Sequence, residues 1–351
     1  MTIRFGVIGA GIIGTLRAQS IRDNPETALI AVADPKPEHA ERAARGTQAK
    51  VCQDYRQLLD TPVDAVIVSS PLPDHAEQVT AALSAGKHVL CEKPLGNSTA
   101  SCRRMLTAAA GTGAHLAVGF NHRYYPCIKF LKRVIDEGRI GILDHLRIFG
   151  GHDGLANFRA DWQYRAPDSG GGAMMDVGIH MTDLARYLLG DITEVYGIAS
   201  NNIWKIVGSE DNAIVVLKSP AGIPAVYQAT WTEWKGYRFH VEAYGDRGMV
   251  RGYYAPMFNL LITQEKPGGP RKRQVKLYPE IILREKLKSW TSTALISFQE
   301  ELRDFVKLLG GDNRVPLADG VAGLRAVEIA DAVYRSTASG KAVSLEAHQS
   351  P

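Results

Sequence analysis

Two groups of ionisable residues have types and spacing suited to moving a proton at a bound ligand. The first is Lys93, within the tetrapeptide CEKP at 91–94 that follows a short apolar run. Ligands of open parallel sheets bind beyond the carboxyl ends of the strands, so a lysine there can reach a ligand. Pro94 disfavours helical backbone at Lys93, so the ammonium is carried on an extended or turn segment. An ordinary exposed lysine in a strand-to-helix loop is the alternative.

The second group is the pair Asp176 and His180, on a helix predicted over about residues 173–189. Residues four apart share one helix face, so the carboxylate and the imidazole lie one turn apart. An imidazole, with an ordinary pKa of about 6.5, suits proton transfer near neutral pH. A capping carboxylate and a half-buried structural histidine are the alternative. The glycines at 170–172 favour the functional interpretation, because they permit another group to approach the amino end of the helix.

The glycine pattern at 9–14 indicates a cofactor site. GAGIIG lies between a predicted strand at 3–8 and a predicted helix to about residue 22, the context of a dinucleotide-binding turn. Gly9 suits the tight turn, Gly11 the close approach of a pyrophosphate, and Gly14 the packing of helix on strand. We therefore predict a bound dinucleotide, and a glycine-rich turn without a ligand is the alternative.

Asp34 closes the second predicted strand, twenty residues after Gly14. A carboxylate in this place accepts hydrogen bonds from ribose hydroxyls and repels a 2′-phosphate. The sequence therefore predicts NAD as the cofactor rather than NADP. Lys36 and Arg42 lie close enough in sequence to weaken that preference.

Apolar runs alternate with amphipathic helices through residue 119 and predict a six-stranded parallel sheet covered on both faces. We interpret residues 1–122 as a Rossmann NAD(P)-binding domain. Loops of this domain supply the other predicted cofactor contacts, which are Ile12, Ile13, Ser70, Pro71, His75, Glu92, Lys93 and Asn121. His75 could instead only occupy the first turn of a helix.

From residue 143 the predicted strands become longer and alternate apolar with polar residues. This pattern predicts a largely antiparallel sheet with one face covered and the other free for a partner or substrate. We therefore assign residues 123–351 to a second α/β domain. Helices predicted at 295–309 and 321–336 are packing elements, and the C-terminal helices could pack back on the first domain.

The composition is that of an ordinary soluble protein long enough for two domains: 351 residues, 45% hydrophobic and 22% charged, with a formal charge of +4. Basic residues gather around 271–273 and 284–288, and no nucleic-acid-binding module accompanies them.

The four cysteines lack metal-ligand spacing, which fits reduced thiols in a cytosol. The sequence offers no room for a signal peptide and no apolar run approaching the roughly 20 residues of a membrane helix. We expect a cytoplasmic protein without nucleic-acid, membrane or metal partners.

The motifs GAGIIG, Asp34, EKP at 92–94 and the glycine run before Asp176 and His180 resemble, in order and approximate spacing, those of the Gfo/Idh/MocA family of glucose-fructose oxidoreductase and inositol dehydrogenase-like oxidoreductases. The resemblance covers nearly the whole chain. It implies a Rossmann domain, a C-terminal α/β domain on an open mixed sheet, and homodimers or homotetramers made through that sheet. It also implies NAD(H)-dependent oxidation of a secondary hydroxyl of a sugar, cyclitol or sugar derivative, or the reverse reduction.

Carried over by motif, Lys93, Asp176 and His180 form the catalytic group and also contact the substrate. His180 is then the acid/base, Asp176 orients it and adjusts its pKa, and Lys93 hydrogen-bonds the reacting oxygen. In a variant, Lys93 transfers the proton. The other predicted substrate contacts lie in segments expected to rim the crevice, and are Arg123, Asn157, Arg159 and Trp162. Arg159 and Trp162 could equally pack on the surface.

Two alternatives come from the same resemblance. Some relatives use tightly held NAD to cleave glycosidic bonds through a transient ketone, and others are non-catalytic NAD- or sugar-sensing regulators. The joint presence of Lys93, Asp176 and His180 favours an enzyme over a regulator. The sequence does not select among a free sugar, an inositol, a sugar phosphate and a nucleotide sugar.

Overall fold

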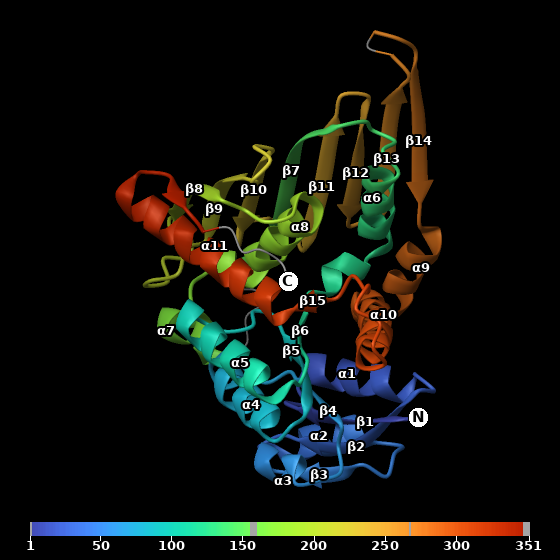
Figure 1. Cartoon of the computed structure of the whole chain (residues 1–351), viewed down its shortest axis with the longest axis vertical. Coiled ribbons are helices and arrows are strands. Elements are labelled where there is room, and N and C mark those ends of the chain that lie inside the picture. Colours follow the sequence, from blue (N-terminus) through green and yellow to red (C-terminus); the bar gives the residue numbers. More distant parts are fainter. Residues whose placement is uncertain (1, 155–159, 267, 347–351) are drawn as a thin grey trace. The chain divides into compact units, whose positions relative to one another are not determined.

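A computed structural model describes residues 2–154, 160–266 and 268–346 of the chain. The chain forms two compact units (Figure 1). Unit 1 comprises Met1–Tyr124 and Leu287–Val327, and unit 2 comprises Tyr125–Lys286 and Glu328–Pro351. The first break therefore falls after Tyr124, where the sequence predicted a boundary after residue 122. Residues 287–327, within the predicted second domain, belong to unit 1.

Unit 1 contains a seven-stranded sheet in the order β15-β6-β5-β4-β1-β2-β3. β1 to β6 are parallel, as the sequence predicted, and β15 pairs antiparallel with β6 at the edge. The strands are β1 (Ile3–Ile8), β2 (Thr27–Ala33), β3 (Lys50–Cys52), β4 (Ala65–Val68), β5 (His88–Glu92), β6 (Leu116–Gly119) and β15 (Ala318–Asp319). β4 is buried along its whole length, as expected of an apolar strand covered on both faces.

The helices of unit 1 connect these strands and cover the sheet (Figure 1). They are α1 (Ile12–Arg22), α2 (Pro37–Ala44), α3 (Tyr55–Leu59), α4 (Leu72–Ser84), α5 (Thr99–Thr112), the 3₁₀ turn η1 (Asn121–Tyr124) and α10 (Thr291–Leu309). Two further helices, α9 (Pro279–Lys288) and α11 (Gly320–Ser339), contain the later breaks between the units.

The strand order places β1 between β2 and β4, which is the topological switch point of this fold. Dinucleotides bind outside the carboxyl ends of the strands at such a point. Gly9, Ser69 and Lys93 directly follow β1, β4 and β5. Because these strands are parallel, all three residues lie at the same edge of the sheet.

Helix α10 completes the core of unit 1 although it comes from the C-terminal part of the chain. Leu302 and Phe305 are fully buried in one cluster with Phe5 and Ile21. The rings of Phe5 and Phe305 lie 6.1 Å apart between centroids. The first unit is therefore built from two separate stretches of sequence.

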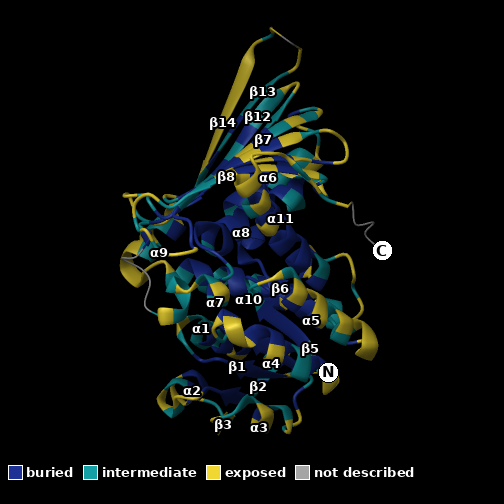
Figure 2. Ribbon diagram, turned by 90° about the vertical axis from the view of Figure 1, so that its left-hand side faces the viewer, coloured by how far each residue is buried: buried dark blue, intermediate teal, exposed yellow. Residues whose placement is uncertain are grey.

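Unit 2 contains a nine-stranded sheet in the order β14-β13-β12-β11-β7-β10-β9-β8-β16. Only β7 and β10 pair in parallel among its described strands, so the sheet is mixed and predominantly antiparallel. The strands are β7 (Leu143–Gly151), β8 (Glu194–Ser200), β9 (Asn212–Lys218), β10 (Pro224–Thr230), β11 (Arg238–Gly245), β12 (Gly248–Tyr254), β13 (Phe258–Gln264), β14 (Arg271–Leu277) and β16 (Val343–Ser344). β14 is exposed along its whole length (Figure 2).

Helices pack on one face of this second sheet, where α6 (Pro126–Asp136) contacts β11 to β13 and α8 (Ile179–Leu189) contacts β7 and β10. The 3₁₀ turn η3 (Asp161–Tyr164) and the short helix α7 (Ala166–Ser169) precede α8. On the other face, apolar residues of β8 to β10 remain exposed. Within the described residues, no helix has the length and hydropathy to cross a membrane.

The helix predicted over residues 173–189 differs from a continuous α-helix. Met174–Gly178 form a π-helical turn, η4, which leads directly into α8. A π turn closes its hydrogen bonds between residues five apart, so it is wider than an α turn. Asp176 lies in this π turn. A pattern of residues spaced four apart in the sequence does not distinguish a π turn from an α turn.

Candidate functional site

The glycine turn after β1 has a shape that fits a dinucleotide. Gly9 has a φ of +83°, and a Cβ there would lie 2.4 Å from the backbone nitrogen of Ser70. A Cβ at Gly14 would lie 1.8 Å from the carbonyl oxygen of Gly9, so this glycine lets the helix pack on the turn. A Cβ at Gly11 would meet no atom within 4 Å. The open space beside Gly11, at the amino end of α1, suits an anionic group because the first amides of a helix lack partners within it.

Asp34 is fixed at the carboxyl end of β2 by backbone donors. The amide of Ala10 donates to Oδ2 at 2.7 Å, and the amide of Lys36 donates to Oδ1 at 2.9 Å. Each carboxylate oxygen can accept more than one hydrogen bond, so ribose hydroxyls can still be bound. Arg42 donates to the carbonyl of Ala10 at 3.2 Å, which holds its guanidinium beside the turn. The position of the Asp34 carboxylate supports the predicted preference for NAD, whereas Arg42 lies close enough to the turn to weaken it.

His75 is a buried link between two loops at the edge of the sheet. Its Nδ1 lies 3.0 Å from the carbonyl oxygen of Pro94, and its Nε2 lies 3.0 Å from that of Ser70. Burial lowers the pKa of His75, which favours the neutral ring. A neutral ring carries a single N–H, so His75 donates to one of these two carbonyls and only packs against the other. Its predicted contact with the cofactor stays a prediction.

The other predicted cofactor residues have different surroundings. Ser70 donates its hydroxyl to Oε1 of Gln78 at 2.5 Å, and Asn121 donates its amide to the hydroxyl of Ser297 at 2.9 Å. The amide of Asn121 therefore ties η1 to α10. Pro71 and Ile12 are exposed, Ile13 is half-buried, and Glu92 pairs with Arg17.

Lys93 is half-buried directly after β5, and the Lys93–Pro94 peptide bond is cis. His122, on η1, is buried, and its burial together with the positive charge of Lys93 lowers the pKa of His122 to about 3. His122 is therefore neutral at physiological pH. The imidazole of His122, which feels the charge of Lys93, is thus itself uncharged.

Asp176 is held in unit 2 by two neutral donors that the sequence did not predict. Oδ2 of Asp176 lies 2.7 Å from Nε2 of His152, and the indole Nε1 of Trp231 donates to the same oxygen at 3.1 Å. The amide of Gly154 donates to Nδ1 of His152 at 3.0 Å. Nδ1 is therefore the nitrogen without hydrogen, and Nε2 donates its hydrogen to Asp176. The carboxylate is oriented by two N–H groups while its side chain stays 32% exposed.

The one parallel strand pair in the described part of the second sheet brings these donors together. His152 directly follows β7 and Trp231 directly follows β10. Since β7 and β10 run parallel in register, their carboxyl ends lie at the same edge. The local sequence does not show this pairing. A histidine after the two glycines at the end of β7 is the one available signal.

His180 lies in the first turn of α8 and is buried, at 5% exposure. It follows Asp176 by four residues, across the junction between the π turn and the α-helix. The sequence predicted that Asp176 orients His180. That role stays a prediction, and the contacts given above show that His152 and Trp231 help to orient Asp176.

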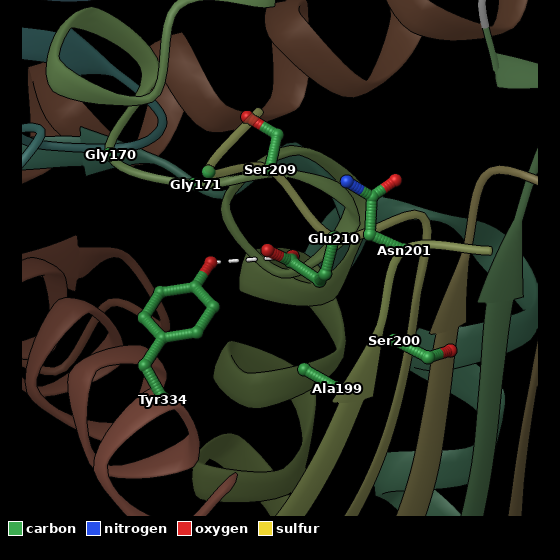
Figure 3. A pocket seen from close by; sticks show the side chains of 9 residues that line it. Gly170, Gly171, Ala199, Ser200, Asn201, Ser209, Glu210 and Tyr334 are labelled. Atoms are coloured by element: carbon green, nitrogen blue, oxygen red, sulfur yellow. Dashed lines mark hydrogen bonds between the residues drawn. The ribbon is translucent and has the colours of Figure 1, made fainter. Parts of the chain in front are cut away.

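The glycine run at 170–172 allows close approach within the chain itself (Figure 3). A Cβ at Gly171 would lie 1.9 Å from the hydroxyl of Tyr334, and one at Gly172 would lie 2.0 Å from the carbonyl oxygen of Glu210. The Glu210 carboxylate accepts from the amides of Gly172 at 3.0 Å and Met174 at 2.6 Å. The group that these glycines admit to the amino end of the helix is therefore Glu210. Burial raises the pKa of this carboxyl.

The structure describes two of the four further residues predicted to contact the substrate. Arg123 is buried in unit 1 and donates to the carbonyl of Pro316 at 3.0 Å. Trp162 is half-buried in η3. Asn157 and Arg159 lie outside the described residues. Lys93 belongs to unit 1, and Asp176 and His180 belong to unit 2.

Comparison with known proteins identifies the family. The family model "Oxidoreductase family, NAD-binding Rossmann fold" matches residues 3–120, and "GFO/IDH/MocA C-terminal domain" matches residues 128–251. The chain is 31% identical to "Uncharacterized oxidoreductase YrbE" of Bacillus subtilis, over 97% of this chain and 96% of the relative. It is 31% identical to "Inositol 2-dehydrogenase" of Pseudomonas fluorescens, over 100% of this chain and 99% of the relative.

A solved structure of levoglucosan dehydrogenase in complex with NADH has the same fold, with a TM-score of 0.86 at 24% identity, covering 99% of this chain and 100% of that chain. The two matching domain models account for most of the sequence, and the glycine turn and Asp34 fit the cofactor named by the first of them. The chain belongs to the Gfo/Idh/MocA family of NAD-dependent oxidoreductases.

Proposed function

We propose that this chain is a dehydrogenase that oxidises a secondary hydroxyl of a cyclitol or sugar, or reduces the corresponding ketone, with an inositol as the first substrate to test. The observation that carries this proposal is the Asp176 carboxylate, oriented by His152 and Trp231 four residues before the buried His180. The relative named inositol 2-dehydrogenase supports the substrate class.

His180, Asp176 and Lys93 have different roles in the proposed proton transfer. NAD, when bound at the glycine turn, supplies the hydride acceptor. His180 takes the proton of the hydroxyl, and the negative charge of Asp176 stabilises the imidazolium that results. Lys93 donates a hydrogen bond to the reacting oxygen and favours the negative charge that develops on it. Arg123, Asn157, Arg159 and Trp162 remain the candidates for further substrate contacts.

Turnover with a panel of polyols tests this function. Myo-inositol, other inositols and common aldoses are incubated with NAD or NADP, and absorbance at 340 nm is followed. We expect NADH to accumulate with at least one cyclitol or sugar, and more slowly with NADP. In a parallel incubation with glycosides, release of free sugar without accumulation of NADH would indicate the glycosidase alternative, which relatives named as dehydrogenases do not favour. Binding of NADH without turnover of any member would indicate a sensor.

We propose further that the chain forms homodimers or homotetramers through the open face of the second sheet. Exposed apolar side chains are paired directly across neighbouring strands, Tyr196 with Val216 and Ile198 with Ile214. Val226 of β10 extends the same patch beside Val216. Contiguous apolar patches on a sheet face are typical of interfaces. Light scattering of the wild type and of Ile198→Glu tests this, and equal masses would contradict it.

We also propose a cytoplasmic location. All four cysteines are free thiols and all are buried. Proteins with unpaired cysteines are typical of reducing compartments. Fractionation of the native source, with the protein followed by mass spectrometry, tests the proposal.

A further inference from the structure

A buried cation on α1 joins two carboxylates from distant parts of unit 1. Arg17 is fully buried, and its Nη2 lies 2.6 Å from Oε1 of Glu92. Its Nε donates to the same oxygen at 2.7 Å. Its Nη1 lies 2.6 Å from Oε2 of Glu301 on α10. The guanidinium also lies over the ring of Phe298, 3.9 Å from its centroid.

The space around this guanidinium is closed on the side of the sheet. A Cβ at Gly119, the last residue of β6, would lie 2.7 Å from Nη2 of Arg17 and 3.2 Å from Oε2 of Glu92. The Glu301 side chain is only 1% exposed and that of Glu92 only 13%. The three charged groups are therefore packed against protein with little access to water.

Burying three charged groups in this way is costly. The desolvation of an ion pair commonly cancels its Coulombic gain, so a buried pair is weak evidence of a stabilising role. One positive charge also faces two negative charges here. Burial raises the pKa of Glu301 to about 7, against the opposing effect of Arg17. Glu92 raises this pKa as well, and the nearby Arg123 lowers it. Burial raises the pKa of Tyr124 on η1, and the charge of Glu301 raises it further.

The positions of Arg17 and Glu92 in the chain indicate a role for this buried group of charges. Arg17 lies on the helix that begins at the glycine turn, and Glu92 immediately precedes Lys93. Through Arg17 the position of the lysine loop is coupled to the helix beside the cofactor turn. Glu301 holds the other side of the same guanidinium from α10.

We propose that Arg17 is a positioning residue that fixes Glu92, and through it the backbone of Lys93, relative to the cofactor turn, with Glu301 holding the guanidinium in place. This inference rests on the proposed function, because it assigns Lys93 a place in the reaction. Arg17 and Glu301 touch no reacting atom in this scheme. They act only by placing the loop that carries the lysine.

Arg17→Met and Arg17→Lys test the proposal, with Arg4→Met as a matched control. Arg4 forms an exposed pair with Asp64 on the same sheet. We expect Arg17→Met to lower kcat by about 10- to 100-fold, the scale of a misplaced reacting group. The Kd of NADH should change by less than about threefold, and Arg17→Lys should recover part of kcat. Arg4→Met should leave all three quantities unchanged.

Hydrogen exchange gives a readout that needs no substrate. In Arg17→Met, amides of residues 91–96 should exchange faster while β1 and β4 keep their protection. A uniform rise of exchange across unit 1, or an unchanged kcat with a lowered melting temperature, would show a purely structural role and overturn the proposal. If the wild type turns over no member of the polyol panel, the proposed function fails, and exchange at 91–96 still decides whether Arg17 positions the lysine loop.

The pH profile of Glu301→Gln provides a second test. In the wild type, loss of the Glu301 proton leaves one negative charge in excess in the buried group of Arg17, Glu92 and Glu301, and Glu92 directly precedes Lys93 in the chain. We expect kcat between pH 5.5 and 8.5 to show this ionisation in addition to that of His180, and Glu301→Gln to show only one. Identical profiles for the two proteins would exclude Glu301 from the positioning scheme.

Discussion

The two units hold their key carboxylates in opposite ways. In unit 1, Glu92 and Glu301 share a full positive charge on Arg17 and are almost sealed from water. In unit 2, Asp176 accepts from two uncharged N–H groups and its side chain is 32% exposed. A cation cancels the charge of its partner, whereas neutral donors fix an orientation and leave the charge in place. The first arrangement therefore suits positioning, and the second suits a group whose negative charge takes part in chemistry.

Replacing His180 by Ala should have the largest effect, because it removes the residue that we propose as the base beside the Asp176 charge. We expect kcat to fall by about two to four orders of magnitude, the usual scale of general acid–base catalysis. The Kd of NADH, measured by fluorescence titration, should stay nearly constant. A collapse of NADH affinity with a modest loss of kcat would place His180 in the cofactor site. It would contradict the proposal that the charge of Asp176 serves a base.

Glu301→Gln should remove a pH dependence of stability from unit 1. Burial raises the pKa of Glu301 from 4.5 to about 7, so its contribution to the free energy of unfolding is fully present below pH 4.5 and is lost as pH rises through 7. Each pKa unit corresponds to about 1.4 kcal/mol, which makes the loss about 3 kcal/mol.

Urea unfolding at pH 5 and pH 8 measures this effect. The difference in unfolding free energy between Glu301→Gln and the wild type should shift in favour of the variant at pH 8. A difference that is the same at both pH values would mean that Glu301 does not titrate in this range.

His152→Ala should disturb Asp176 without removing its charge. The variant leaves the carboxylate with Trp231 as its remaining donor of the two described, so the side chain becomes less well oriented. We expect kcat to fall about 10- to 100-fold, as for a reacting group that is slightly misplaced. His152→Gln, whose side-chain amide also offers an N–H donor, should recover part of the loss. Equal activities of the Ala and Gln variants would show that the hydrogen bond itself is unimportant.

Trp231→Phe should give the smallest effect, because it removes one N–H donor and keeps most of the buried ring. A hydrogen bond to a charged group contributes about 1.5–3 kcal/mol to stability, and only part of that bears on activity. We expect a loss of kcat of about threefold to tenfold, measured beside the melting temperature. A larger loss than that of His152→Ala would reverse the order of the two donors.

The features predicted well from the sequence are those set by local pattern. The glycine turn, Asp34 and the parallel strands of unit 1 follow from a short stretch in which strand, turn and helix are contiguous. The pairing of Asp176 with His152 and Trp231 depends on two parallel strands that are distant in sequence, and no periodicity reports such pairing. The glycine run predicts close approach of another group, but the groups that approach, Glu210 and Tyr334, come from other parts of the fold.

The return of α10 to unit 1 has a consequence for synthesis of the chain. Domains usually fold as units from the amino end while the ribosome is still working. Here the cluster around Phe5 lacks Leu302 and Phe305, and Arg17 lacks Glu301, until synthesis has passed α10. During translation, one apolar side of the nascent nucleotide-binding unit must therefore stay exposed to water for about 180 more residues, while Arg17 can already pair with Glu92. Chaperone engagement should concentrate on this interval.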